Sequence, residues 1–346
     1  MKILIVGMGS IGQRHARLIR SVMGEGAELW CLRKRGPELL INPPEAVECD
    51  SVARHYGMRE FPDLDAALAQ RPTAVFVCNP TSLHLQTAIR CAQSGAHLFI
   101  EKPVGCSAEE FRLLRRTAEE NGVAVCVGYQ TRFDPMVEKV AALLSEPGNE
   151  VVSCRMRWMT YLPAHHPYED YRLGYAARED LGGGVIFCLS HELDLISRFF
   201  GLPQSVYALQ GEAHSLDMPV DTSVSALFSC AAPSGSFPLH LQLSFAQGDE
   251  ERGFSVETAS SVIRCDLVKR RLECVAHSGG RREWDFSNVI RDDLFRAQCE
   301  HVCRDVLTGG TPRVGLAEAG ESLSMALSMH KSLRTGEVEK ILPFNE

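Results

Sequence analysis

Residues 3–12, ILIVGMGSIG, decide the fold of this chain. They place a buried apolar run directly before a G-x-G-x-x-G fingerprint, and apolar residues then recur at helical spacing up to Val22. The segment therefore predicts a strand, a tight turn and a helix in that order. Such a turn suits the pyrophosphate of a dinucleotide, because glycines let the backbone approach and the helix N-terminus attracts anions. A glycine-rich turn without a ligand is the alternative. The candidate contacts with a cofactor are Gly7, Gly9, Ser10, Ile11 and Gly12.

The end of the next predicted strand indicates which dinucleotide binds. About twenty residues past the glycines, an NAD site usually has an acidic residue for the ribose 2′-hydroxyl, whereas an NADP site has an arginine for the 2′-phosphate. Here Leu29–Leu32 is followed by Arg33, Lys34 and Arg35, with no carboxylate among them. A planar guanidinium suits bidentate contact with a phosphate. The sequence therefore predicts NADP, with NAD possible if these residues form only a solvated basic turn.

Length and composition limit the class of protein. With 346 residues the chain exceeds what one hydrophobic core usually organises, so two domains are expected. The net charge of -8 argues against a nucleic-acid partner. No apolar run approaches the roughly 20 residues of a membrane span, and the N-terminus does not resemble a secretory signal, so a cytoplasmic protein without a membrane partner is expected. The 13 cysteines contain no C-x-x-C pair and are interpreted as core residues, so no metal is expected.

Strand and helix patterns alternate from residue 1 to about 127, which predicts a parallel, doubly wound α/β sheet of the Rossmann type. Asn79-Pro80 and Glu101-Lys102-Pro103 both follow the ends of predicted strands, at the sheet edge where ligands bind. The predicted strands after the first two are 74–78, 97–100 and 123–127, and the helices are 82–94 and, from a capping box of Ser107 and Glu110, about 108–121.

A different pattern of long strands begins near residue 150, so 128–346 is predicted to be an α+β domain with a large open, mostly antiparallel sheet. In Phe237–Phe245, apolar and polar residues alternate, which indicates a half-buried antiparallel strand. Similar runs predict about five or six strands in all. The helix at about 315–334 is expected to pack back on the first domain. The other runs are 151–161, 205–211, 222–230, 254–259 and 271–276, with helical patterns at 288–307 and 315–334 and a short strand at 338–342.

Lys102 is the first candidate for chemistry. Pro103 disfavours a helical conformation for the preceding residue, which predicts an extended lysine at the strand tip. An ammonium group there can donate a hydrogen bond to a substrate oxygen and stabilise negative charge that develops on it. A surface lysine before a turn is the alternative.

His191 is the second candidate and lies in GGGVIFCLSHELD, residues 182–194. Cys188, His191 and Asp194 are three residues apart and are expected to share one face of a single helix. A histidine titrates near neutral pH and can act as a general base. A structural histidine that hydrogen-bonds Asp194 is the alternative.

The segment from Tyr161 to Arg178 concentrates histidine, tyrosine and charged residues between two ordered elements. A polar, aromatic loop of this kind suits recognition of a hydroxylated ligand, although a solvated connection has the same composition. The candidate substrate contacts are Tyr161, His166, Tyr171 and Arg178.

The order and spacing of five motifs resemble the Gfo/Idh/MocA oxidoreductases, the family of glucose-fructose oxidoreductase and inositol dehydrogenase. The segment from Tyr161 to Arg178 resembles the branch found in surface-glycan and activated amino-sugar pathways. The five motifs are Gly7-Met-Gly-Ser-Ile-Gly12, Val77-Cys-Asn-Pro-Thr-Ser-Leu-His84, Glu101-Lys-Pro103, Gly128-Tyr-Gln-Thr-Arg-Phe133 and Gly182 to Asp194.

This resemblance implies hydride transfer between the nicotinamide of NADP or NAD and a carbon that bears a hydroxyl or carbonyl group, usually on a sugar or cyclitol. In the oxidative direction, His191 takes the hydroxyl proton and Lys102 stabilises the oxyanion. The matched motifs add candidate cofactor contacts at Asn79, Pro80, Thr81, His84, Glu101, Lys102 and Arg132, and candidate substrate contacts at Lys102, Gln130, Cys188 and His191.

Cys188 departs from the family, many of whose members have an aspartate there, and its spacing to His191 is one residue shorter than usual. A thiol cannot replace a carboxylate that orients a base. Either Lys102 and His191 carry the proton transfer alone, or Glu169 or Asp170 substitutes, or the chemistry has been lost. The alternative functions are a catalytically silent regulator that binds cofactor and sugar, and a redox-neutral enzyme with tightly bound cofactor.

A homodimer or homotetramer is expected to form through the open face of the C-terminal sheet. Helices are available for only one face of this sheet. Strands such as Phe237–Phe245 would leave an apolar patch on the other face if both faces carried bulky residues. The resembling family also pairs its sheets across subunits.

Overall fold

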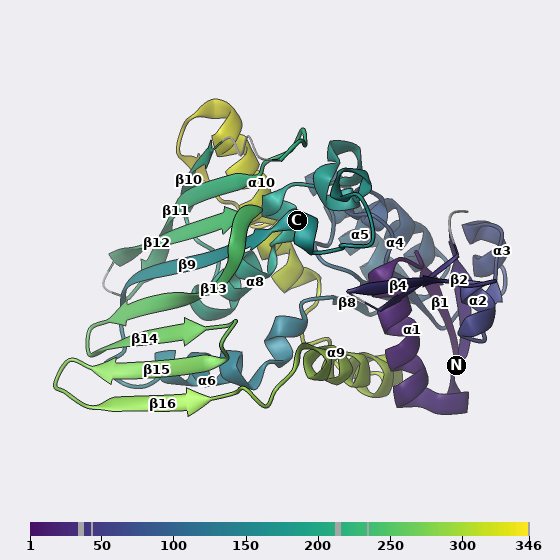
Figure 1. Cartoon of the computed structure of the whole chain (residues 1–346), viewed down its shortest axis with the longest axis horizontal. Helices are drawn as coiled ribbons and strands as arrows, with labels where there is room; N and C mark the ends of the chain where they lie inside the picture. Colours follow the sequence, from purple (N-terminus) through teal and green to yellow (C-terminus); the bar gives the residue numbers. More distant parts are fainter. Residues whose placement is uncertain (34–37, 43, 212–215, 234, 345–346) are drawn as a thin grey trace.

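The computed structural model describes residues 1–33, 38–42, 44–211, 216–233 and 235–344. Within these ranges, a parallel sheet of six strands and a mostly antiparallel sheet of nine strands lie side by side (Figure 1). This confirms the fold class predicted from the sequence. The boundary between the two domains, placed at residue 127, remains a prediction.

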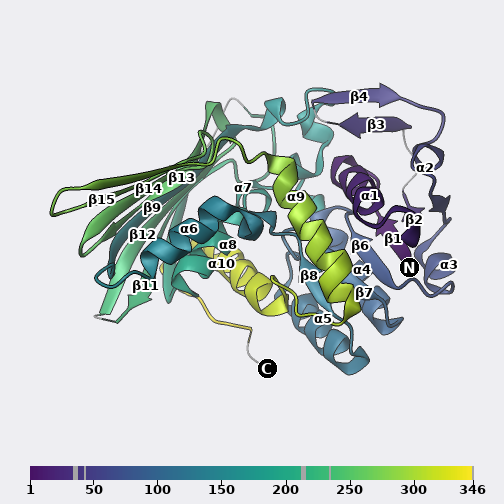
Figure 2. The same ribbon diagram turned by 90° about the horizontal axis from the view of Figure 1, so that it is seen from below.

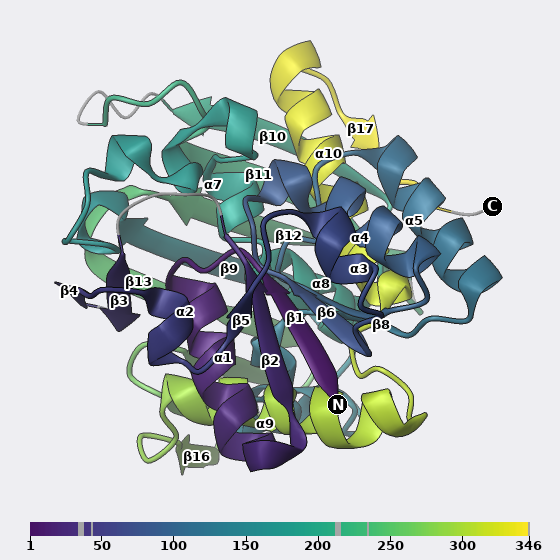
Figure 3. The same ribbon diagram turned by 90° about the vertical axis from the view of Figure 1, so that its right-hand side faces the viewer.

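The six-stranded sheet has the order β5-β2-β1-β6-β7-β8, and every strand pair is parallel. Side chains of β1 alternate between two apolar layers, because helices cover both faces of the sheet. Ile3 and Ile5 pack toward α1 and α9, whereas Leu4 and Val6 pack toward α3, α4 and α5 (Figure 3). The strands are β1 Lys2–Val6, β2 Glu28–Leu32, β5 Arg59–Glu60, β6 Ala74–Val77, β7 His97–Ile100 and β8 Val125–Val127. The helices are α1 Ser10–Met23, α3 Leu64–Leu68, α4 His84–Gln93, α5 Ala108–Asn121 and α9 Arg291–Glu300.

A hairpin and a short helix follow β2, in a segment for which the sequence patterns gave no element. They are β3 Leu39–Asn42, β4 Glu45–Glu48 and α2 Val52–His55. Gln13 of α1 fixes this segment, because its side chain donates to Leu39 O at 2.9 Å and accepts from Ile41 N at 2.9 Å.

The second sheet corrects the prediction of five or six strands. Its order, among the described residues, is β16-β15-β14-β13-β9-β12-β11-β10-β17. The predicted strand Phe237–Phe245 buries one face as expected, but it is antiparallel only to β11 and lies parallel to β9. The strands are β9 Val151–Tyr161, β10 Ser205–Gly211, β11 Ser223–Ala232, β12 Gly235–Ser244, β13 Ala246–Thr258, β14 Ser261–Asp266, β15 Arg271–Ala276, β16 Arg281–Asp285 and β17 Glu339–Lys340.

Helices cover the inner face of this sheet and leave its outer face open (Figure 2). They are α6 Pro135–Leu144, α7 Val185–Cys188, α8 His191–Phe200 and α10 Leu316–Thr335. The outer face is more polar than expected: His240 and Pro238 are exposed on β12, and isolated leucines such as Leu227 stand among serines. None of the described helices is long and apolar enough to cross a membrane.

The C-terminal helices link the two sheets. On α10, a Cβ atom at Gly320 would lie 2.9 Å from the ring of Phe111 on α5, so the two helices touch. The sulfurs of Cys299 on α9 and Cys303 in the following π-helical segment, His301–Asp305, lie 4.0 Å apart in the core, while the His301 ring contacts Asp305.

Candidate active site

The glycine turn after β1 has the geometry that a dinucleotide needs. Gly7 has a φ of +96°, and a Cβ atom there would lie 2.6 Å from Cys78 O, so only glycine fits. Gly12 is packed against the Gly7 carbonyl, whereas a Cβ atom at Gly9 would meet no atom within 4 Å. The first turn of α1, which contains Ser10 and Ile11, has no acidic residue and no side-chain cap. The turn therefore leaves open space beside an uncapped helix N-terminus, which fits a pyrophosphate.

Arg33 lies at the tip of β2, where the sequence places the ribose contact. Its guanidinium forms an ion pair with Glu38, and the same carboxylate accepts a hydrogen bond from Val52 N at 2.7 Å. An acidic residue therefore stands close to the predicted phosphate contact, where sequence spacing showed none. Lys34 and Arg35 lie outside the described residues.

The loops after β6 and β7 are held together by His84. Its ring nitrogens contact Pro103 O at 2.9 Å and Asn79 O at 2.7 Å, so the ring bridges the two strand ends. Pro80 and the buried Thr81 lie between these contacts and α4. Among the described residues, the buried Asn79 Oδ1 has no hydrogen-bond partner, and it is a candidate acceptor for a bound ligand.

Glu101 is a buried carboxylate at the end of β7, and both of its oxygens have partners. Its Oε1 accepts a hydrogen bond from His15 Nε2 at 2.7 Å, and its Oε2 accepts from the backbone N–H of Lys102 at 3.2 Å. Burial acts to raise the pKa of Glu101, but the hydrogen bond and charge of His15, together with the charge and backbone N–H of Lys102, lower it overall. Glu101 is therefore ionised and anchors the chain directly before Lys102.

Lys102 extends from the end of β7 toward the second domain. Its Nζ donates a hydrogen bond to Cys188 O at 2.8 Å. Burial has the largest effect on Lys102 and lowers its pKa. Cys188 and Glu101 act to raise this pKa, whereas the positive charges of Arg291 and Arg252 lower it further. One of the three ammonium hydrogens is used, so the others remain available for a substrate oxygen.

His191 is the first residue of α8 and is 3% exposed. Its Nδ1 lies 3.4 Å from Thr131 Oγ1, and its ring packs on Tyr129 at a centroid distance of 5.6 Å. Burial lowers the pKa of His191 well below its ordinary value, and the charge of Lys102 lowers it further. The imidazole is therefore neutral at pH 7 and able to accept a proton.

The single helix predicted through residues 185–200 is wrong. The chain forms α7 up to Cys188, leaves helical geometry at Leu189, and starts α8 at His191. Cys188 consequently does not share a helical face with His191. Asp194 is bound by Arg132, so it does not satisfy His191 either.

Cys188 accepts a hydrogen bond from Lys102 through its backbone oxygen, and its thiol lies near the hydroxyl of Tyr175. Burial raises the pKa of Cys188 to about 12, against the opposing effect of Lys102. The nearby sulfur in turn raises the pKa of Tyr175 well above its ordinary value. Both groups are protonated at neutral pH. Tyr175 was not among the predicted site residues.

The loop from Tyr161 to Arg178 lies near the glycine turn, because Ser10 is close enough to Tyr168 to lower the pKa of its hydroxyl against the effect of burial. The pKa of His165, one residue from the predicted contact His166, is lowered to about 4. Burial is the largest cause, and nearby charges that include Lys102 contribute as well. Of the predicted substrate contacts, Tyr161 is 37% exposed. The other three have partners within this part of the structure: His166 Nδ1 lies 2.7 Å from Tyr168 Oη, the Tyr171 hydroxyl accepts a hydrogen bond from Asp217 N, and Arg178 forms an ion pair with Asp180.

Three further residues near His191 escaped the sequence patterns. The Trp158 ring centroid lies 6.1 Å from that of His191, and the Arg252 guanidinium lies 3.8 Å above the same tryptophan. Burial has the largest effect on the pKa values of Lys102 and His191, and the charge of Arg291, at the start of α9, lowers both values further. Their roles depend on strand register and helix placement, which spacing does not reveal.

Arg132 forms a buried ion pair with Asp194, and its contact with the cofactor remains a prediction. Its Nε lies 3.0 Å from both Asp194 oxygens and its Nη2 lies 2.9 Å from one of them, with the arginine side chain 8% and the aspartate 0% exposed. The guanidinium is therefore engaged in a buried structural ion pair. Gln130, in the same segment, is also buried.

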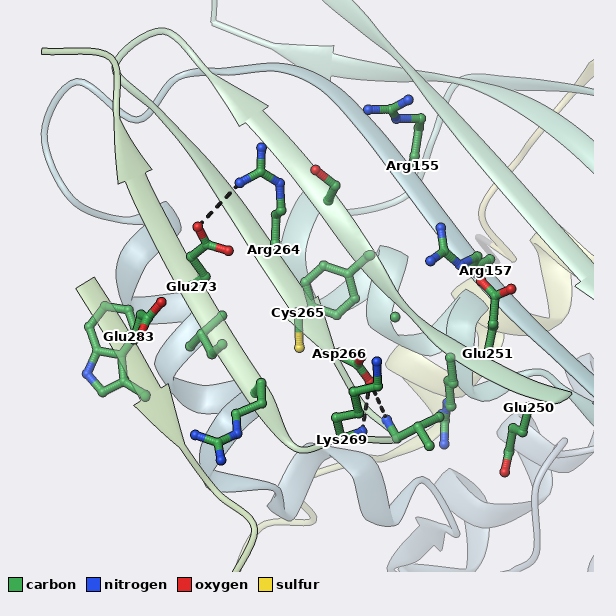
Figure 4. A pocket seen from close by; sticks show the side chains of 18 of the residues that line it. Arg155, Arg157, Glu250, Glu251, Arg264, Cys265, Asp266, Lys269, Glu273 and Glu283 are labelled. Atoms are coloured by element: carbon green, nitrogen blue, oxygen red, sulfur yellow. Dashed lines mark hydrogen bonds and ion pairs between the residues drawn. The ribbon is translucent and has the colours of Figure 1, made fainter. Parts of the chain in front are cut away.

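A hollow of about 830 Å³ lies on the outer face of the second sheet, and Arg252 is among the residues that line it (Figure 4). Charged side chains line it, and many pair across neighbouring strands, as Arg264 does with Glu273 and Arg157 with Glu251. The hollow contains neither Lys102 nor His191, so size alone would misplace the site.

Comparisons with known proteins agree with this geometry. The model of an oxidoreductase family with an NAD-binding Rossmann fold, GFO_IDH_MocA, matches residues 1–129. The scyllo-inositol 2-dehydrogenase (NAD(+)) of Bacillus subtilis (strain 168) is 23% identical over 345 residues, which cover 96% of this chain and 94% of the relative. The D-xylose 1-dehydrogenase (NADP(+)) 2 of Haloferax volcanii is 25% identical over 269 residues, 76% of this chain and 78% of the relative.

Among solved structures, the chain resembles the WlbA dehydrogenase from Bordetella pertussis in complex with NADH and UDP-GlcNAcA. The TM-score is 0.78, at 21% identity over 99% of each chain. This likeness supports the two-sheet fold. The names of the two sequence relatives contain different dinucleotides, NAD(+) and NADP(+), so these relatives do not decide which one this chain binds.

Proposed function

The chain belongs to the Gfo/Idh/MocA family of oxidoreductases, and on this premise we propose that it transfers a hydride between NADP and a hydroxyl- or carbonyl-bearing carbon of a sugar, cyclitol or activated sugar derivative. The observation that carries the proposal is the contact of Lys102 Nζ with Cys188 O at 2.8 Å, beside a neutral His191 and next to the glycine turn. The named activities of the relatives support the same class of reaction.

In the proposed reaction, Lys102 stabilises charge and His191 transfers a proton. With its pyrophosphate held by the glycine turn, the dinucleotide would supply the hydride chemistry through its nicotinamide. Lys102 donates a hydrogen bond to the reacting oxygen and stabilises its negative charge. His191 moves the proton of that oxygen through Nε2, which has no hydrogen-bond partner among the described residues, while Nδ1 faces Thr131.

Cys188 takes no proton in this scheme, because its pKa of about 12 keeps it a thiol. The two loop carboxylates that the sequence offered as substitutes are already engaged. Glu169 pairs with His166 at 3.1 Å, and Asp170 pairs with Arg172 at 2.6 Å. These contacts favour proton transfer by Lys102 and His191 alone.

The proposal is tested by mixing the protein with NADP⁺ and a panel of sugars, cyclitols and nucleotide sugars and following the absorbance of the reduced nicotinamide. Accumulation of reduced cofactor with one class of substrate is expected. Binding of cofactor and sugar with no chemical change would identify a silent regulator. Conversion of the sugar without net consumption of cofactor would identify a redox-neutral enzyme.

NADP is expected to bind more tightly than NAD, and Arg33→Ala is expected to remove most of this preference. A hydrogen bond to a charged group contributes about 1.5–3 kcal/mol, which corresponds to a preference of roughly 10- to 150-fold. Titration of both cofactors into the wild type, the Arg33 variant and an Arg116→Ala control on α5 measures it. Equal affinities in the wild type, or a preference that survives Arg33→Ala, would refute the assignment.

The protein is expected to be a homodimer or homotetramer that pairs through the outer face of the second sheet. This face is open, and its cross-strand ion pairs and scattered exposed leucines, such as Leu227 at 52%, suit a mixed polar and apolar interface. Light scattering at micromolar concentration gives the mass. A monomer there contradicts the prediction, as does an oligomer unaffected by Leu227→Glu.

A further inference from the structure

We propose that the substrate carries a carboxylate, and that Arg252 binds it beside His191. The proposal rests on the proposed function and deepens it by naming the class of substrate. It begins with the position of Arg252 on β13, opposite Trp158 on β9. The guanidinium lies 3.8 Å above the indole ring, whose centroid is 6.1 Å from that of His191. Arg252 is therefore one side chain away from the group that moves the proton.

Arg252 has an incomplete set of partners. Its Nε donates to Glu192 Oε1 at 2.7 Å, but among the described residues neither its Nη2 nor Glu192 Oε2 has a hydrogen-bond partner, although both atoms are buried. The pair that Arg132 forms with Asp194, also on α8, leaves the buried Nη2 of Arg132 without a hydrogen-bond partner in the described part of the chain, but both Asp194 oxygens accept from Arg132 Nε. Glu192, in contrast, uses only Oε1 on Arg252. The Arg252–Glu192 pair therefore leaves both a donor and an acceptor for a further group.

The charge around His191 favours an anionic acceptor. Burial is the largest cause of the lowered pKa of His191, and the charges of Lys102, Arg252 and Arg291 lower it further. The charges of Arg252 and Arg291 also lower the pKa of Lys102. This shows an excess of positive charge at the site, in a chain whose formal net charge is -8. The partners of Arg252 belong to the second sheet and its covering helix, not to the glycine turn where a dinucleotide's phosphates fit. The missing anion is therefore assigned to the substrate.

A carboxylate fits better than a phosphate dianion. Arg252 offers one fork of donors, and Glu192 already compensates part of its charge. A planar monoanion can accept two parallel hydrogen bonds from such a fork. A sugar acid also keeps the hydroxyl groups that hydride transfer requires, and the unpartnered Glu192 Oε2 can accept a hydrogen bond from one of them.

The test compares pairs of ligands that differ only in a carboxylate: glucuronate with glucose, galacturonate with galactose, and UDP-glucuronic acid with UDP-glucose. Each ligand is titrated into the NADPH-saturated protein by calorimetry. The acid is expected to bind about 10- to 100-fold more tightly than its neutral twin in at least one pair, the ratio typical of a hydrogen bond to a charged group. Arg252→Gln is expected to abolish that ratio and to leave the affinity of the neutral twin within about twofold.

Arg157→Gln is the matched control, because Arg157 lies on the same sheet, is 58% exposed on the outer face and pairs with Glu251. It removes the same charge and is expected to change nothing. Arg252→Lys keeps the charge beside Glu192 but loses the fork, so it should fold and still lose most of the preference. The proposal is overturned if the acid shows no preference in all three pairs, if the preference survives in both Arg252 variants, or if Arg157→Gln reduces it equally.

These outcomes are separate from those that test the proposed function. Oxidation of neutral sugars with NADP⁺, without any preference for the acid, would overturn the carboxylate site and leave the dehydrogenase standing. Arg252-dependent binding of an acid with no hydride transfer to or from any member of the panel would support the carboxylate site and overturn the dehydrogenase.

Discussion

Lys102→Met is expected to lower kcat by about 10²- to 10³-fold and to leave the affinity for the cofactor within about twofold of the wild type. Methionine keeps the length of the side chain but cannot donate to Cys188 O or to the reacting oxygen. The charge that stabilises the oxyanion is therefore lost, whereas the glycine turn is untouched. His191→Ala is expected to cost about 10²- to 10⁴-fold, the usual range for general acid–base assistance.

A pH profile distinguishes this role from a structural one. Burial and then Lys102 lower the pKa of His191, so the wild-type kcat should fall only well below pH 6.5, where the neutral imidazole is lost. Removing the positive charge at position 102 raises the pKa of His191, and the acid limb of the residual activity should move to higher pH. Lys139→Met, which removes an ammonium that lies over Trp284, is the control and should move neither kcat nor the limb. Full turnover in both Lys102→Met and His191→Ala would exclude the proposed roles.

The parts of the fold that sequence predicted are those that local patterns determine. The strands at 97–100, 151–161, 205–211 and 271–276 have the predicted bounds, because alternation or a bounded apolar run defines each of them. The strand count was wrong because β14 and β16 were not recognised; β16 is mostly charged and exposed, so it shows no apolar alternation. The parallel pairing of β12 with β9 joins segments about 80 residues apart, which no local pattern encodes.

A distant residue fixes where α7 begins. Asp221, just before β11, accepts hydrogen bonds from Val185 N through its carbonyl oxygen and from Ile186 N through its carboxylate, each at 2.9 Å. Gly184, at a φ of +100°, makes room for that carboxylate. The helix α7 ends at Cys188 although the apolar spacing continues through α8, so spacing alone predicted one helix.

In the candidate site, too, local patterns could be recognised in the sequence and contacts between distant segments could not. Sequence motifs identified Lys102 and His191, because each stands in a short pattern at the end of an element. Trp158 and Arg252 were missed, because they meet only through the register of β9 and β13. Arg132 was assigned to the cofactor from the matched motif Gly128–Phe133, and that motif gave no indication of its buried partner Asp194 on α8.

Loss of Asp194 is expected to be the most destabilising of the changes considered. Asp194→Ala leaves the guanidinium of Arg132 buried without its partner, and breaking a buried ion pair in this way typically costs about 3–5 kcal/mol. Arg132 is 8% exposed, and the charge of Asp194 raises its pKa against the effect of burial, so it cannot escape the penalty by losing its proton. Urea unfolding measures the change in the free energy of unfolding. Glu120→Ala, which breaks an exposed pair with Arg116, should change it by less than about 1 kcal/mol.

Two further variants decide what this pair does. Replacing both partners, as Arg132→Met with Asp194→Leu, removes the unpaired charge and should recover most of the lost stability. Because Asp194 stands one helical turn after His191, the double variant should still misplace that base and lower kcat. Its cofactor affinity should stay within about twofold of the wild type, since the pair does not touch the glycine turn. A large loss of cofactor affinity would instead return Arg132 to the cofactor site, and an Asp194→Ala protein as stable as the wild type would remove the structural role.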